Sequence, residues 1–557
     1  ALTNDVVGYP FSSRKLALPQ HGDADRIRSY LGEEVGAFFT FFSMMIRSLR
    51  WPVPIAAITL VIEYCRPLQV TLGDIRMLRV LYGIVVLVWG MWFATYVQHD
   101  FSMAHLRWGS GGQTHTRLKA PGYDPRRRGD PMQSVRSACG RLVTALFLVV
   151  VVMSTMWFGF VVHDPTLASV LQTILTFMLS AVWGRVAKWT VQLENKRAQS
   201  AFDRSLMMRL AFVKLFVFLF PLLRLAFLYP IVEKVCTNDA DVTVAAARVA
   251  SKYYHAEANN LAELNISSHS PVFTEWVGLM RMQSVEILAD QIAHFKFSSP
   301  QHQEVCFRGC HPKSCEVIDG QMWCTTHCEY NLRNYLRTLY LSHTLLTVAK
   351  IVFRILQVRL AAREELEIQK KKASGRFYSF YSLLQYQEKC HIIAPYAYQS
   401  PGGSAIEDVL EVILGFAVLI CFSAVCPLMA ITGFVVLTFE YRCLVYRMTW
   451  ITCRPFPHVS HGLHEVVIIL EVIVFVAIAV NAMLVICVVR TALDNLSPWN
   501  ELAVISASGA CLVFAKVILK VALQEKPQDL VDAADQNDDF QEKLQPLRKS
   551  KLMATEA

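Results

Sequence analysis

The sequence predicts an all-α polytopic membrane protein with ten transmembrane helices, and three observations support this prediction. Hydrophobic residues make up 54% of the 557 residues, whereas charged residues make up only 18%. The mean hydropathy of +0.34 is too high for an ordinary soluble globular protein. Apolar runs of about 20 residues, the length that spans a bilayer as a helix, recur along the whole chain.

Ten apolar runs are long enough to be read as spanning helices. Only Cys426-Pro427 divides the seventh from the eighth, so the count of ten depends on a helix break at that proline. The first twenty residues lack the apolar core that follows a basic start in a cleavable signal peptide, so we expect the first span to direct insertion. The predicted spans are 49–65, 78–97, 142–163, 167–189, 206–232, 336–358, 408–427, 428–447, 464–488 and 499–521.

Lysine and arginine residues gather next to the helix ends on one side, which the positive-inside rule places in the cytosol. Both termini then lie in the cytosol, as a short segment at 1–45 and a polar tail at 525–557. The net charge of +9 needs no nucleic acid as a partner, because a positive cytosolic face beside anionic membrane lipids accounts for it. Two arginines in the first outer loop, Arg66 and Arg76, are a weaker signal for the opposite orientation. The basic positions on the predicted cytosolic side are 98–141, 194–197, 369–376, Arg442, Arg447 and Arg454.

This topology places spans one to five within 46–232 and spans six to ten within 336–524, with an outer segment at 233–335 between them. The outer segment is polar and contains six of the fifteen cysteines. An even number of clustered cysteines in an exported segment predicts disulfide bonds, whose connectivity the sequence leaves open. The six are Cys236, Cys306, Cys310, Cys315, Cys324 and Cys328.

Two further patterns in the outer segment bear on its location. Asn265-Ile266-Ser267 is an N-glycosylation sequon, which agrees with an extracellular or luminal position. A zinc site that includes His311 and His327 stays an alternative to disulfides, although the spacings match no common zinc-binding pattern. We therefore expect the protein in the plasma membrane or in a membrane of the secretory pathway.

The run LENKRAQSAFDRSLMMRLAFVKLFVFLFPLLRLAF at 193–227 begins before the fifth predicted span and continues into it. It resembles the ENHRTQ-x-E-x-x-x-SL signature of the anoctamin family. Four other blocks resemble blocks of that family in the same order, which is hard to obtain by chance. They are IRSYLGEEVGAFF at 27–39, VWGMWFATYVQHDFSMAHLRWG at 88–109, the block 408–455 and NAMLVI at 481–486.

The resemblance implies a ten-helix homodimer that conducts ions, scrambles phospholipids, or does both, usually under calcium control. Calcium is the one cofactor that it implies. Asp408 and Glu411, three residues apart and hence on one helix face, match the two acidic positions of the family's helix seven, and Glu440 matches the acid of helix eight. Hard oxygen ligands from several segments are what Ca²⁺ requires.

Other positions depart from the family's calcium sites. Leu444 stands where helix eight has an aspartate, and one register puts Ile355 and Arg359 at the ligand positions of helix six. Thr95 and Lys520 replace the acids of a second site. We therefore expect a degenerate site with weak or absent calcium regulation, in which Arg359 acts as a site-neutralising cation.

Three interpretations of the acids stay open. They pair with Arg359, Lys350 or Arg442 inside the membrane, they bind calcium, or they lie at a solvated helix end. Lys214, in the middle of the fifth span, is a pore candidate that would attract anions, with snorkelling or pairing with an acid as the alternative. Snorkelling is also expected for Arg224, nearer the outer end.

The sequence argues against an enzyme, because it contains no Gly-rich phosphate loop and no HExxH or GxSxG motif. The predicted function is that of an anoctamin-like ion channel, chloride or non-selective, or a phospholipid scramblase. The alternative is a non-conducting structural subunit of a larger membrane assembly, with other membrane-protein subunits as partners.

Overall fold

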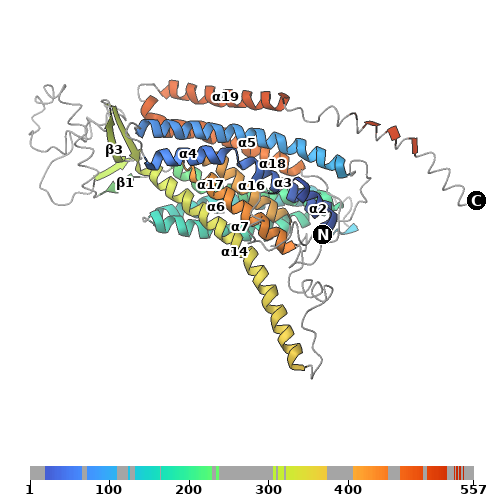
Figure 1. Ribbon diagram of the computed structural model, residues 1–557. Helices are drawn as coiled ribbons and strands as arrows, with labels where there is room; N and C mark the ends of the chain where they lie inside the picture. Colours follow the sequence, from blue (N-terminus) through green and yellow to red (C-terminus); the bar gives the residue numbers. More distant parts are fainter. Residues whose placement is uncertain are drawn as a thin grey trace, which may run out of the picture.

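The computed structural model is a bundle of long helices with short strands at one end (Figure 1). We call this end of the bundle the strand end. The structure describes residues 21–65, 72–108, 132–162, 165–228, 234–237, 305–308, 312–318, 321–372, 405–448, 464–493 and 498–522, and isolated residues at 19, 123–125, 532, 535–536, 539–540 and 543–544. Asn265 and Cys310 lie outside these described residues.

Most of the described chain is helical. In chain order the elements are α2 (His21–Leu31), α3 (Glu33–Leu49), α4 (Pro52–Cys65), α5 (Leu72–Trp108), α6 (Met132–Val161), α7 (Pro165–Leu193), α8 (Gln199–Leu223), a π-helical turn η3 (Arg224–Leu228), strands β1 (Lys234–Thr237), β2 (Val305–Arg308), β3 (Pro312–Ile318) and β4 (Gln321–Thr326), and helices α14 (His327–Lys372), α16 (Ala405–Phe422), α17 (Leu428–Tyr446), α18 (His464–Leu493) and α19 (Pro498–Ala522).

Seven helical segments in the described part of the chain are long and apolar enough to cross a membrane. They are Glu33–Cys65, Met77–Ala104, Ser134–Phe158, Leu167–Leu193, Ala201–Leu228, Leu428–Tyr446 and Glu465–Leu484. The other three predicted spans fall on α14, which carries acidic and basic residues, on α16, which carries three acidic residues, and on α19, whose apolar part is the shorter Gly509–Leu519. The count of ten spans stays a prediction.

The first candidate span is longer than the sequence predicted, because it begins at Glu33 and not near residue 49. Gly32, with a φ of 102° that favours glycine, makes the turn from α2 into α3. Nearly every residue of α3 is buried, including Phe38, Phe39, Phe41 and Phe42. Part of the segment 1–45, predicted to precede the membrane, therefore lies in the apolar core.

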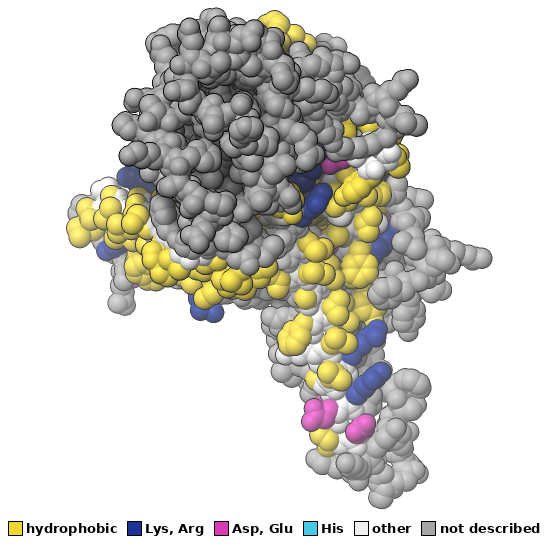
Figure 2. Space-filling model, turned by 90° about the vertical axis from the view of Figure 1, so that its left-hand side faces the viewer, with side chains coloured by type: hydrophobic (Ala, Val, Ile, Leu, Met, Phe, Trp, Pro, Cys, Tyr) yellow, Lys and Arg dark blue, Asp and Glu magenta, His cyan; other side chains and the backbone are white. Residues whose placement is uncertain are grey.

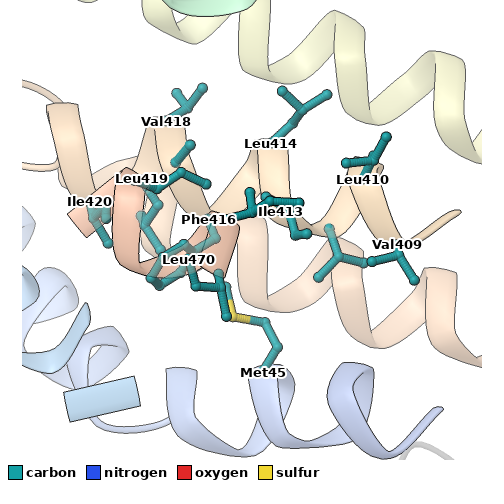
Figure 3. Packing of buried hydrophobic residues seen from close by; sticks show 14 of the residues in the cluster. Met45, Val409, Leu410, Ile413, Leu414, Phe416, Val418, Leu419, Ile420 and Leu470 are labelled. Carbon is teal, nitrogen blue, oxygen red and sulfur yellow. The ribbon is translucent and has the colours of Figure 1, made fainter. Parts of the chain in front are cut away.

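Helix α16 lies at the centre of the bundle (Figure 3). Its side chains from Val409 to Phe422 are buried on nearly every face, because α3, α5, α8, α17 and α18 all pack against it. Figure 3 shows Met45 of α3 and Leu470 of α18 next to these side chains. A helix surrounded by others needs apolar residues all round, which explains the almost uninterrupted apolar sequence of α16.

The predicted break between the seventh and eighth spans is present. Helix α16 ends at Phe422, and Pro427 is the N-cap of α17, so the two helices are joined by a short turn. Helix α5 approaches this region closely, since a Cβ atom added at Gly83 would lie 2.6 Å from the Cβ of Ala424. The missing side chain at Gly83 thus lets the two backbones meet.

The strands form two antiparallel pairs, so the predicted all-α fold holds for the helical bundle but not for the outer segment. In β1 and β2, Cys236 lies opposite Cys306 in the ladder. In β3 and β4, Cys315 lies opposite Cys324. Strand β4 runs directly into α14 and also packs against it and against α5.

The outward faces of the bundle are apolar. Figure 2 views the molecule from the strand end and shows yellow side chains along the visible helices. On α6, Leu142, Leu146, Val149, Met153 and Trp157 are each more than half exposed. They recur at helical spacing, so α6 turns an apolar stripe away from the protein, as a lipid-facing helix does.

Candidate functional site

The carboxylate of Asp408 is paired with Arg447. Asp408 lies in the first turn of α16, and Arg447 is the C-cap of α17. The Arg447 Nη2 atom donates a hydrogen bond to Asp408 Oδ2 at 2.9 Å, and both side chains are mostly buried. Each charge lies at the helix end where the macrodipole favours it, the acid at an N-terminus and the base at a C-terminus. The partner is none of the three residues predicted from the sequence.

Arg359 makes different contacts from those predicted. From α14 it donates a hydrogen bond to the hydroxyl of Tyr446, and its guanidinium lies 5.5 Å from the centroid of that ring. Tyr446 immediately precedes Arg447, so Arg359 joins α14 to the end of α17 that neutralises Asp408. The cation paired with Asp408 is Arg447, whereas Arg359 contacts Tyr446, the residue before Arg447.

The other two predicted acids lie further along the same helix pair. Glu440 in α17 is buried with 6% of its surface exposed, and Glu411 on α16 is partly buried. Tyr340 of α14 interacts electrostatically with Glu440 and packs against Gly433, where an added Cβ atom would overlap its hydroxyl. Glu440 therefore lies at the contact between α14 and α17.

These carboxylates do not assemble into a calcium site. Within the described ranges, no group of three or more His, Cys, Asp or Glu residues lies close enough to hold a metal ion. Arg447 occupies a position beside Asp408 where a cation would bind, and Leu444 is a buried apolar residue with 1% exposure. The donor set does not fit Ca²⁺, which needs six to eight oxygens in typical sites.

A polar seam runs between α6, α7 and η3, and none of its five uncharged members was predicted from the sequence. It contains the buried residues Thr155, Ser169, Gln172, Thr173 and Thr176. The Gln172 amide donates to the hydroxyl of Thr155 at 3.5 Å. The four α7 members recur at helical spacing, i, i+3, i+4 and i+7, and this periodicity is the signal that could have identified them.

Two buried cations lie in α8 and η3, and one of them, Arg224, bonds to a residue of this seam. Arg224 is 7% exposed and donates from Nη1 to the backbone carbonyl of Thr155 at 3.1 Å. It is therefore bonded inside the protein, and the predicted snorkelling is wrong. Lys214 is also buried, with 8% exposure, in the middle of α8.

Helix α14 packs over α7 and α8 next to the seam. The imidazole of His343 stacks on Phe177 of α7 with ring centroids 5.7 Å apart. It also meets Phe218 of α8 edge-on at 5.3 Å. His343 thus fills the place where α7, α8 and α14 meet.

A cluster of four charged side chains joins three helices at the strand end, and we call it the strand-end ionic cluster. Arg79 of α5 contacts Glu63 of α4 at 2.6 Å and Glu329 of α14 at 2.7 Å. Arg333 of α14 contacts the same two carboxylates at 3.0 and 2.9 Å. All four side chains are at most 17% exposed. The sequence analysis did not find this cluster, because its members are far apart in the chain.

Comparison with known proteins decides the family. The model of the family described as "Anoctamin: Calcium-activated chloride channel" matches residues 27–537, nearly the whole chain. The chain belongs to the anoctamin family. The resemblance drawn from the five sequence blocks is thereby confirmed, and a search of curated proteins finds no match.

Membership in the anoctamin family has three consequences at the family level. Family members are channels or scramblases, so the chain falls in a class of membrane transport proteins and not of enzymes. Together with the apolar helices, the match supports an integral multi-pass membrane protein. Calcium activation is part of the family's description, and within the described part of this anoctamin no group of three or more His, Cys, Asp or Glu residues could hold a metal ion.

Proposed function

We propose that this anoctamin-family chain is an anion-conducting channel whose gating is weakly dependent on calcium or independent of it. The polar seam between α6, α7 and η3 is the single observation that supports conduction most directly. The hydroxyls of Thr173 and Thr176 donate to backbone carbonyls of their own helix, so these side chains remain buried between the helices as a band of satisfied polar groups. Here the α7 members form a row at helical spacing, and the buried Arg224 bonds to Thr155 opposite them.

The charge of the seam supports anions as the substrate. Lys214 and Arg224 are both buried, and Arg224 donates a hydrogen bond to the backbone carbonyl of Thr155 in the seam. A positive charge in a low-dielectric pore attracts anions and raises the barrier for cations. Chloride is the simplest probe ion for this pathway.

The enclosure of the seam favours ions over phospholipids. A scramblase needs a polar groove open to the bilayer so that a headgroup crosses while the tails stay in lipid. In this structure α14 covers the seam from the side of α7 and α8, and the outward face of α6 is apolar. Scrambling by this conformation is therefore the second candidate, and it requires α14 to move away from α7.

The test is halide flux and dye-quench lipid scrambling in proteoliposomes, each with and without calcium. We expect halide flux without scrambling and with little response to calcium. Thr176→Val removes a buried polar group of the seam, and Met178→Leu is the matched control on the outward face of α7, where Met178 is 62% exposed. The first variant should change halide flux or selectivity and the second should not. Absence of both flux and scrambling would favour the non-conducting structural subunit.

The assembly and the orientation are part of the same proposal. We place the strand end outside the cytosol and both termini inside, in the plasma membrane or a secretory-pathway membrane. We further propose a homodimer formed through α19, whose side chains Phe514, Val517, Ile518 and Val521 recur at helical spacing and are each more than half exposed. The mass of the protein in mild detergent tests this, and a monomer would contradict it.

A further inference from the structure

The cysteines of the strand-end hairpins fall into register. Strand β1 contributes Cys236 and β2 contributes Cys306, and the two are Cα partners in the ladder. Strand β3 contributes Cys315 and β4 contributes Cys324, and these are again Cα partners. Each strand carries one cysteine, and in both ladders cysteine faces cysteine.

This register suits a covalent bond. Directly opposed residues of an antiparallel pair have Cα atoms about 4.5 or 5.5 Å apart, depending on their hydrogen-bonding position. Disulfides join residues whose Cα atoms are about 4.4 to 6.8 Å apart, so both kinds of position qualify. A slip of one residue in either ladder would place each cysteine opposite a different residue type, so the double coincidence argues for selection of this register.

We propose that the disulfide bonds of this protein include Cys236–Cys306 and Cys315–Cys324. Six cysteines allow about fifteen complete pairings, and the two ladders select among them. The remaining two are Cys310, outside the described residues, and Cys328, the second residue of α14. The inference rests on the proposed orientation, because the strand end must face an oxidising compartment.

Formation of each bond is a thiol–disulfide exchange. Two cysteine thiols lose two protons and two electrons and form one S–S bond. The disulfide of an oxidant of the secretory pathway, a protein or small-molecule disulfide, accepts them and is reduced to two thiols. Each cross-link needs one such oxidant, and no metal or other cofactor takes part.

The two bonds would constrain different parts of the chain. Cys236 and Cys306 are 70 positions apart, so their bond closes a long loop and removes much conformational entropy from the unfolded chain. Cys315 and Cys324 are nine positions apart in a hairpin that continues into α14. Their bond fixes β4, which packs against α14 and α5 next to Glu329 of the strand-end ionic cluster.

The decisive experiment is a disulfide map of the full-length protein purified from a membrane without reductant, with free thiols blocked by N-ethylmaleimide. Trypsin gives peptides 235–248 and 297–308, which carry Cys236 and Cys306. We expect them joined. Trypsin with a glutamate-specific protease gives 314–316, which carries Cys315, and 317–329, which carries Cys324 and Cys328. We expect these two joined through Cys324, as tandem fragmentation between Cys324 and Cys328 will resolve.

The map separates two failures. Peptide 235–248 joined to any peptide other than 297–308, or Cys315 bonded to Cys310 or Cys328, overturns the connectivity. Blocked thiols at all the mapped cysteines overturn the proposed orientation of the strand end, whereas halide flux tests the channel function independently.

Paired substitutions give a second readout on the same proteins. Cys236→Ser with Cys306→Ser should expose no new thiol to maleimide, because both partners are removed together. Cys236→Ser with Cys315→Ser is the mismatched control and should expose two new thiols, at Cys306 and Cys324. Equal labelling of the two double variants would overturn the proposal, and if either variant fails to fold, the map of the unmodified protein still decides.

Discussion

Helix α14 is attached to the bundle very differently at its two ends. At the strand end, Glu329 and Arg333 belong to an ionic cluster that includes Arg79 of α5 and Glu63 of α4. Far along the same helix, 26 residues beyond Arg333, Arg359 is attached to α17 through the single side chain of Tyr446. The first attachment joins three helices and is mostly buried, and the second is exposed.

The difference shows which end of α14 is held more strongly by its charged side chains. Breaking the strand-end ionic cluster leaves charged side chains unpaired in a mostly buried position, which is strongly destabilising. An exposed cation–aromatic contact contributes only about 0.5 to 1 kcal/mol. Because α14 packs over the helices of the polar seam, we expect the proposed channel to open by movement of the far part of α14 while its first turns stay in place. Three substitutions and a calcium titration test this comparison.

Arg79→Gln should have the largest effect. It leaves Glu63 and Glu329 with Arg333 as their remaining partner in the cluster, and removal of one member of a buried ion pair costs about 3 to 5 kcal/mol. We expect a large fall in the unfolding temperature of the detergent-solubilised protein. Arg107→Gln on the same helix is the matched control, because Arg107 is 48% exposed and pairs with Asp25 at 3.6 Å. Equal destabilisation by the two variants would contradict the comparison.

Arg447→Gln should come second. The change leaves the carboxylate of Asp408 buried without its charged donor, and a hydrogen bond to a charged group contributes about 1.5 to 3 kcal/mol. Adding Asp408→Asn should recover most of the lost stability, because the buried charge is then removed as well. The same thermal measurement on the double variant checks this, and a further loss of stability would show that the pair is not the source of the effect.

Calcium should have a smaller effect on the unmodified protein. Because Asp408, Glu411 and Glu440 are not gathered into a metal-binding group in the described structure, we expect calcium to change halide flux by much less than tenfold, which corresponds to a coupling of about 1.4 kcal/mol. Flux measured across a calcium titration tests this. Micromolar activation that is lost in Glu440→Gln would mean that the acids bind the ion after all.

Tyr446→Phe should have the smallest effect on stability. It removes the hydroxyl that accepts a hydrogen bond from Arg359 but keeps the aromatic ring under the guanidinium. We expect a change in unfolding free energy below about 1 kcal/mol, together with a higher basal flux because the far part of α14 is released. Reduced flux with unchanged stability would show that this contact holds the open state instead.

The sequence was most informative where its physics is local. Apolar runs predicted the helices, and Pro427 marked the turn between α16 and α17. The predicted start of the first span was wrong because the phenylalanines of α3 were assigned to a segment before the membrane. In the structure only Arg50 and Trp51 separate α3 from α4, and the two helices form one candidate span.

The side-chain partners were beyond the reach of the sequence. Arg447 lies 39 positions from Asp408, and Arg79 lies 250 positions from Glu329. Such pairs depend on how helices cross and rotate in three dimensions, which local periodicity does not report. The α7 part of the polar seam is the exception, since the spacing of Ser169, Gln172, Thr173 and Thr176 was readable in advance.

The length of α14 gives the protein a mechanical property. The helix has 46 residues, about 69 Å at 1.5 Å per residue, and its last part projects away from the bundle in Figure 1. The distance along α14 from Tyr340 to Lys372 is about 48 Å, whereas that from Tyr340 back to His327 is about 20 Å. If the contact of Tyr340 with Gly433 is taken as the pivot, the arm toward the projecting end is more than twice as long as the arm toward the first turn. A force applied at the projecting end therefore produces more than twice the torque of the same force applied at the first turn.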